Sequence, residues 1–164
     1  MNRLQWALVI TLLVAADQAV KYWVSSTMPF HQLVDVLPFL GFYFTYNEGI
    51  AFSFLSSVGA EVLIVLTLVV TAFVLWLWRN LEEGRWLSAL GYALVISGAL
   101  GNLVDRILLG KVVDYILFHV GNWSFAVFNL ADSFISVGAA AIVLDEILIW
   151  HCDRTGKTGI DTDN

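Results

Sequence analysis

Four long apolar stretches dominate the pattern of hydrophobic and polar positions along the chain. They cover residues 4–26, 60–78, 86–108 and 129–150, and most of the charged residues and both prolines lie outside them. Each stretch has close to the ~20 residues that an α-helix needs to cross the hydrocarbon core of a bilayer. The pattern therefore predicts an α-helical integral membrane protein with four transmembrane helices.

The first stretch begins like a secretory signal peptide, with Arg3 before a long apolar run. Apolar residues return after Asp17, however, so we interpret 4–26 as an uncleaved membrane helix. Asp17 and Lys21 lie four residues apart and share one helix face. They form either a structural ion pair whose lysine reaches the interface or part of a functional site.

Two segments between the stretches have a different character. Residues 27–58 contain the aromatic run 39–46, whose composition is typical of a β-strand, followed by a turn signal at Asn47-Glu48-Gly49. Because an open sheet edge cannot face lipid, we expect a small β-rich element outside the bilayer. Residues 109–127 form the second segment expected on this side of the membrane.

The composition supports a single membrane domain over residues 1–150. The chain has 164 residues, of which 59% are hydrophobic and only 13% are charged, against about 25% charged in soluble domains. The net charge of −6 comes without a basic stripe, which argues against nucleic-acid binding. Cys152 is the only cysteine, so an intrachain disulfide is excluded. Residues 151–164 are polar and are expected to form a disordered tail.

The four helices place both termini on one side of the membrane. That side carries Arg3, Arg79, Arg85, Arg154 and Lys157, which makes it cytoplasmic by the positive-inside rule. The opposite, outer side then collects polar residues that are distant in sequence. They are Asp17, Asn47, Asn102, Arg106, Asp114 and Asp132. This convergence predicts one polar site at the outer face.

Asp114 and Asp132 are the candidates for chemistry at this face. Two close carboxylates cannot both ionise easily, so one keeps a proton. The ionised partner can then take a proton from water while the other polarises a carbonyl. Asn129 and Asp132 also resemble a capping box at the start of a helix, whose N-terminus favours an ionised Asp132 and leaves the proton on Asp114.

Other interpretations of these residues stay open from the sequence alone. Asn102 and Arg106 could cap the third helix and contact lipid headgroups without any role in chemistry. Asp105 could pair with a lysine or face water. A metal site built from Asp105, Asp114, Asp132 and His119 matches no standard zinc spacing, so no metal is expected. His119 is interpreted as a surface residue.

At these residues the chain resembles bacterial lipoprotein signal peptidase (signal peptidase II), a family of aspartic peptidases of the inner membrane. The matching blocks span residues 17–135 in the family's order, and the four-helix layout extends the match to about residue 150. They are Asp17–Lys21, Asn47–Phe52, Gly98–Arg106, Val112–Tyr115 and Phe128–Asp132. Ser97 departs from the family pattern, where glycine is expected.

The resemblance implies that Asp114 and Asp132 are the catalytic dyad. The residues implied to shape and support the site are Asp17, Lys21, Asn47, Gly49, Asn102, Arg106 and Asn129. The implied substrate is a diacylglyceryl-modified prolipoprotein, cut before its lipidated cysteine. The resemblance implies inhibition by globomycin and contact with membrane lipids. It implies no cofactor, and we expect a monomer. Residues 39–59 are interpreted as a lid hinged at Gly49 and Gly59.

Two other classes of function remain from the residues alone. A small proton-coupled transporter subunit would carry acids at mid-bilayer depth, whereas these acids lie at the outer ends of the helices. A non-catalytic assembly module would pack through the small residues of the third stretch, which are Gly91, Ser97, Gly98 and Gly101. Such a module would tolerate Asp114→Asn and Asp132→Asn.

Overall fold

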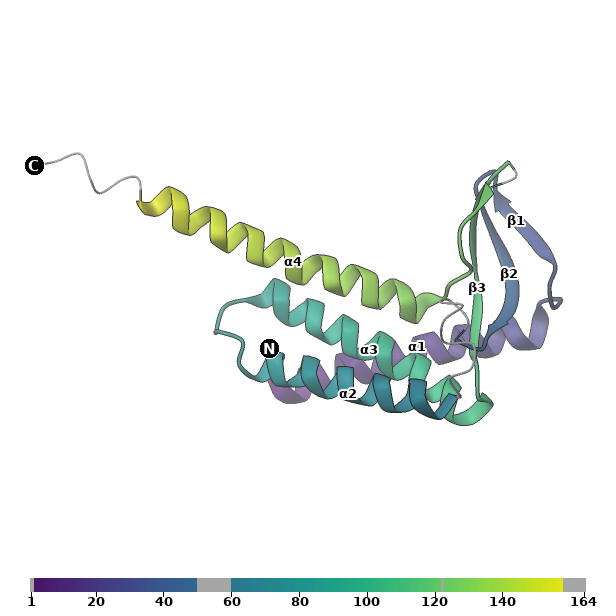
Figure 1. Ribbon diagram of the computed structural model, residues 1–164, viewed down its shortest axis with the longest axis horizontal. Helices are drawn as coiled ribbons and strands as arrows, with labels where there is room; N and C mark the ends of the chain where they lie inside the picture. The colour runs from purple at the N-terminus through teal and green to yellow at the C-terminus, as the bar shows by residue number, and fades with distance from the viewer. Residues whose placement is uncertain (1, 50–59, 122, 158–164) are drawn as a thin grey trace, which may run out of the picture.

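Four helices long and apolar enough to cross a membrane form the body of the protein (Figure 1). The computed structural model describes residues 2–49, 60–121 and 123–157. The helices are α1 (Arg3–Thr27), α2 (Ala60–Arg79), α3 (Trp86–Leu109) and α4 (Leu130–Lys157). The four predicted spans and the helical membrane fold are confirmed, and the first three spans agree with the helices to within one residue at each end.

The fourth helix is longer than predicted. Residues 151–157 continue α4, so the expectation of disorder directly after Trp150 is wrong for this part; residues 158–164 lie outside the described residues. The helix continues because no glycine or proline occurs between Trp150 and Thr155. In addition, the guanidinium of Arg154, one turn on, lies 3.9 Å from the centroid of the Trp150 ring.

A small antiparallel sheet lies at one end of the helices, with strand order β1-β2-β3-β4 (Figure 1). Its strands are β1 (Leu33–Leu37), β2 (Leu40–Asn47), β3 (Val112–Val120) and β4 (Trp123–Ser124). The predicted β-rich element is confirmed by β1 and β2. The segment 109–127 also contributes two strands, which the sequence did not predict. Thr45 pairs with Asp114 in the β2–β3 register, so Asp114 lies on an inner strand.

The core lies where the sheet meets the helices. Val24 of α1, Phe44 of β2 and Val113 and Tyr115 of β3 pack together, each 5% exposed or less. Because these side chains come from a helix and from both inner strands, their burial fixes the sheet against the end of α1.

Close packing around α3 depends on glycine at two positions. A Cβ at Gly98 would collide with the Ala131 carbonyl of α4, and a Cβ at Gly101 would lie 2.6 Å from Oδ2 of Asp17 in α1. This confirms the expectation that small residues of the third span allow close helix approach. As a result α1, α3 and α4 bring their polar residues together.

Candidate active site

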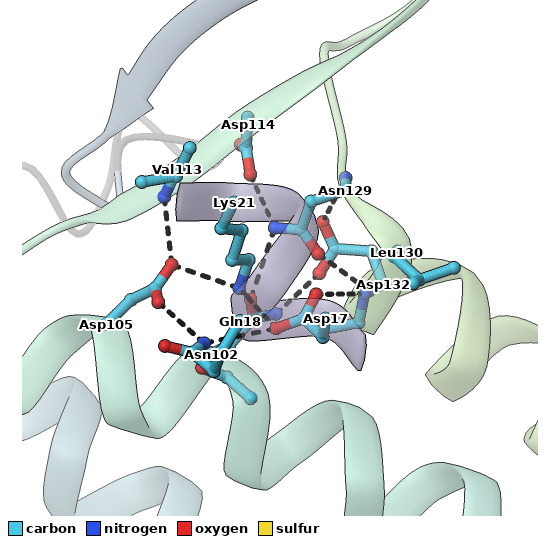
Figure 2. Close-up of polar contacts among 12 residues, drawn as sticks. Asp17, Gln18, Lys21, Asn102, Asp105, Val113, Asp114, Asn129, Leu130 and Asp132 are labelled. Atoms are coloured by element: carbon cyan, nitrogen blue, oxygen red, sulfur yellow. Dashed lines mark hydrogen bonds and ion pairs between the residues drawn. The ribbon is translucent and has the colours of Figure 1, made fainter. Parts of the chain in front are cut away.

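A buried lysine organises one half of the polar site. Nζ of Lys21 lies 3.0 Å from a carboxylate oxygen of both Asp17 and Asp105, and it donates to Oδ1 of Asn102 at 2.9 Å (Figure 2). Lys21 is 2% exposed and Asp17 is fully buried. Asp17 and Lys21 thus form an ion pair, Asp105 pairs with the same lysine, and this lysine is buried within the protein.

The two carboxylates around Lys21 also accept backbone amides from other elements. Asp17 accepts from the amide of Ala131 at 3.0 Å, in the first turn of α4, and Asp105 accepts from the amide of Val113 at 3.1 Å, in β3. Gln18 donates to the carboxylates of Asp17 and Asp105 at 3.2 and 2.9 Å. These bonds connect α1, α3, α4 and β3 around one buried cation.

Asn129 and Asp132 hold the start of α4 in a reciprocal cap. The amide of Asp132 donates to Oδ1 of Asn129 at 3.0 Å, and the amide of Asn129 donates to Oδ2 of Asp132 at 3.2 Å. This is the geometry of a capping box with an aspartate in place of the usual glutamate. The resemblance seen in the sequence is confirmed, and it fixes the Asp132 carboxyl at the helix N-terminus.

Side-chain amides connect Asp132 to Asp114. Asn129 donates to Oδ1 of Asp114 at 2.7 Å and to Oδ1 of Asn102 at 3.1 Å, while Asn102 donates to Oδ1 of Asp132 at 2.7 Å. Asn47 donates to the other oxygen of Asp114 at 3.0 Å. Among residues 2–49, 60–121 and 123–157, no lysine or arginine lies within ion-pair distance of Asp114 or Asp132.

The environment of Asp114 favours its protonated form. Its side chain is 1% exposed, and this burial raises the pKa of Asp114 to about 6, with the negative charge of Asp132 adding to the increase. The hydrogen bonds from Asn47 and Asn129 act in the opposite direction because they favour the carboxylate. Near pH 6, Asp114 therefore populates both its protonated and its ionised form.

Tyr115 is a site residue that the sequence did not reveal. Its hydroxyl oxygen accepts from the amide of Leu130 at 3.2 Å, one of the unpaired amides at the start of α4. Burial raises the pKa of the Tyr115 phenol, so the hydroxyl stays neutral. Gln18 was likewise missed. Both residues lie within the matching blocks Asp17–Lys21 and Val112–Tyr115, but by itself a polar group at the edge of an apolar segment is too common to single out.

Two predicted support residues lie at the edge of the network. Gly49 donates its amide to Oδ1 of Asn47 at 2.8 Å, and it has φ +91°, a conformation that favours glycine. Arg106 donates to the carbonyl of Asn102 at 3.4 Å. Residues 50–52 of the Asn47 motif and the predicted hinge Gly59 lie outside the described residues.

His119 lies away from the aspartates of the network. Its Nε2 is 3.0 Å from a carboxylate oxygen of Asp35 on β1. In the part of the chain that the structure describes, no three histidine, cysteine or acidic side chains are grouped so that they could hold a metal ion. The set of Asp105, Asp114, Asp132 and His119 is therefore not brought together.

Comparisons with known proteins agree with this arrangement. Residues 9–148 match the family described as signal peptidase (SPase) II. The chain is 58% identical to a lipoprotein signal peptidase of Sinorhizobium fredii over 87% of its own length and 86% of the relative's. It is 53% identical to one of Brucella ovis over 89% of its own length and 91% of the relative's.

Two solved structures described as bacterial membrane enzymes have the same fold. One superposes with a TM-score of 0.78 at 25% identity, covering 98% of this chain and 94% of the other. The second has a TM-score of 0.73 at 28% identity, covering 85% and 90%. With the family match over most of its length, the chain belongs to the signal peptidase II family of peptidases.

Proposed function

We propose that this chain is an aspartic endopeptidase that removes the signal peptide from diacylglyceryl-modified prolipoproteins, cutting before the lipidated cysteine. Family membership and relatives named lipoprotein signal peptidase support the substrate class. The observation that carries the chemistry is the pair Asp114 and Asp132. The two carboxyl groups are linked through Asn102 and Asn129 and form no ion pair with a described lysine or arginine, and burial raises the pKa of Asp114 to about 6.

The proposed reaction uses one proton shared by the two carboxyl groups. Ionised Asp132 takes a proton from water, whose oxygen attacks the scissile carbonyl carbon, while protonated Asp114 donates its proton to the carbonyl oxygen. The tetrahedral intermediate then collapses. The C–N bond breaks, the proton on Asp132 passes to the leaving amine, and Asp114 recovers a proton from the hydroxyl group. Each turn of the cycle consumes one water and restores both carboxyl groups.

The surrounding residues would position this pair. Asn129 and Asn102 each bond to a catalytic carboxyl group, and Lys21 in turn holds Asn102 at 2.9 Å. Asp17 ties Lys21 to the start of α4 through the Ala131 amide, and Asn47, oriented by Gly49, holds Asp114 from β2. Arg106 lies beside Asn102 and supplies positive charge at the edge of the site.

The proposed orientation places both termini in the cytoplasm and the site at the outer face of the bacterial inner membrane. The distribution of arginine and lysine supports this orientation. Exposed apolar residues on β1, among them Leu33, Val36 and Leu37, suit a sheet that rests against lipid. A lipidated substrate would enter sideways from the bilayer, and globomycin would compete for the same space. We propose that the protein acts as a monomer and that the aromatic segment 39–46 moves as a lid.

The test is cleavage of a lipidated prolipoprotein by the purified protein. Asp114→Asn and Asp132→Asn should each lower turnover at least ~100-fold, as loss of a general acid or base does, while the protein stays folded. The matched control is Asp145→Asn, an aspartate in the middle of α4 that pairs with Arg85, which should retain turnover within about twofold. A substrate without the lipid should be cut poorly.

Three results would contradict parts of this proposal. Near-normal turnover by both dyad variants would rule out the aspartic mechanism and favour a test of Asp17 and Asp105. Equal cleavage of lipidated and unlipidated substrates would remove the lipid requirement. A folded wild-type protein that never cleaves would favour a transport or assembly role.

A further inference from the structure

A groove lies between α1 and α2 at the end of the helices remote from the carboxylate network. It has a volume of about 400 Å³, within the ~300–1,000 Å³ typical of small-molecule sites. Residues three and four apart on each helix line it, which places them on one face. The apolar part of the lining is Trp6, Ala7, Ile10, Leu75 and Trp78, and the charged part is Arg3 and Arg79.

The two arginines lie at the same end of the groove, since Arg3 begins α1 and Arg79 ends α2 (Figure 1). Among residues 2–49, 60–121 and 123–157, no carboxylate lies within ion-pair distance of either guanidinium. Arg85, at the same end of the bundle, shows the contrast: it pairs with Asp145 at 2.9 Å and Glu146 at 2.7 Å. The groove thus presents two cations whose charge the described side chains leave uncompensated.

The walls below these cations are aromatic and apolar. The rings of Trp6 and Trp78 meet edge to face with centroids 5.6 Å apart, and Trp78 stacks on Tyr92 of α3 at 6.4 Å. Tryptophan side chains of this kind gather at the level of lipid headgroups. Ile10 and Leu75 lie one or two turns deeper along their helices, on the hydrocarbon side of the arginines. The groove therefore changes from cationic to apolar along its length.

We propose that this groove binds one anionic glycerophospholipid, with its phosphate between Arg3 and Arg79 and an acyl chain along Ile10 and Leu75. Basic pockets between membrane helices bind phosphate-bearing headgroups in this way. A soluble anion would leave the apolar walls unused, and a neutral lipid would leave both guanidinium groups without a partner. The proposal is independent of the peptidase reaction because the groove shares no residue with the carboxylate network.

Native mass spectrometry of the purified full-length protein tests the proposal, with phosphatidylglycerol and phosphatidylcholine of the same acyl chains as probes. The wild type should retain one phosphatidylglycerol at least ~10-fold more tightly than phosphatidylcholine. The double variant Arg3→Gln, Arg79→Gln should lose this preference. Ala7→Phe, which fills the groove without changing its charge, should weaken phosphatidylglycerol binding by a similar factor.

Arg154→Gln is the matched control, because Arg154 is an arginine near the same end of the bundle but on α4 and outside the groove. It should leave binding unchanged, and thermal unfolding should show that all variants are folded. Equal affinity for the two lipids would overturn the proposal. An equal loss in Arg154→Gln, or no loss in Ala7→Phe, would also overturn it by indicating general surface charge. A dimer dissociated by Ala7→Phe would assign the groove to a second copy of the chain.

Discussion

The two ends of the helical bundle differ in how their acidic residues are paired with cations. Where α3 begins, Arg85 contacts both Asp145 and Glu146, and the hydroxyl of Ser88 donates to Asp145 at 2.5 Å. The Arg85 and Asp145 side chains are 16% and 13% exposed. Each acid here contacts a cation, so the cluster acts as a clamp of ion pairs that joins the start of α3 to α4.

At the other end, among the described residues, only two of the four acids of the network form an ion pair. Lys21 compensates Asp17 and Asp105, whereas Asp114 and Asp132 are held by amides. Amide donors orient a carboxyl group but carry no full charge to keep it ionised, and burial raises the pKa of Asp114 to about 6. The difference between the two ends is that ion pairs hold the acids of the clamp and the two acids around Lys21, whereas the two acids without an ion pair are those proposed for proton transfer.

Removing the buried cation should have the largest effect on stability. Lys21→Met leaves two buried carboxylates without compensation, which costs about 3–5 kcal/mol of unfolding free energy. Denaturant unfolding in detergent measures the loss. Arg85→Met, at the other end, should cost about 1 kcal/mol because its partners are partly exposed. Equal losses for the two variants would contradict the distinction between the two ends.

A smaller perturbation should separate catalysis from stability. Gly101→Ala places a methyl group 2.6 Å from Oδ2 of Asp17, and overpacking of this kind costs about 1–3 kcal/mol. Because Asp17 anchors the start of α4, turnover per folded molecule should fall about tenfold, as expected for a small displacement of catalytic groups.

Gly91→Ala is the control for this substitution, because its methyl group would meet the Gly138 carbonyl at 2.7 Å, away from the network. It should lose stability but keep its turnover per folded molecule. Turnover measured beside thermal unfolding separates the two effects. If both variants lose turnover in proportion to their stability, the glycine at 101 has no special role in positioning Asp17.

The smallest expected effect is a shift in the pH dependence of turnover. Turnover that needs protonated Asp114 should fall as pH rises through about 6. Asn47→Ala removes a donor that favours the carboxylate, so the pKa of Asp114 should rise further. The pH at which turnover falls to half should then increase by about one unit. Thr45→Ala, which loses a contact to His31 instead, should leave the midpoint unchanged. A downward shift in Asn47→Ala would contradict this assignment.

The sequence predicts the features that depend on local pattern. The lengths of the hydrophobic stretches predicted the four helices, and the spacing of Asp17 and Lys21 placed both residues on one helix face. Asn129 and Asp132 predicted a helix cap. Each of these depends on residues within a few positions of one another, where helix geometry determines the contact. The convergence of polar residues on one face followed from counting the spans.

The contacts that join distant segments could not be predicted in this way. The pairing of β2 with β3, the bonds of Gln18 to Gly101 and Asp105, and the hydroxyl contact of Tyr115 all join residues from separate elements. Such contacts depend on how the elements pack, which periodicity does not encode. The extension of α4 past Trp150 could not be predicted from polar composition, although no glycine or proline follows it before Gly156.

The central claim is that Asp114 and Asp132 share a titrating proton, and infrared difference spectroscopy of the detergent-solubilised protein tests it most directly. A band from a protonated carboxyl group should disappear as pH rises through about 6, with a midpoint that belongs to the pair. It should be absent from Asp114→Asn and present in Asp145→Asn. A band that persists unchanged in Asp114→Asn, or no carboxyl titration near that pH, would contradict the account.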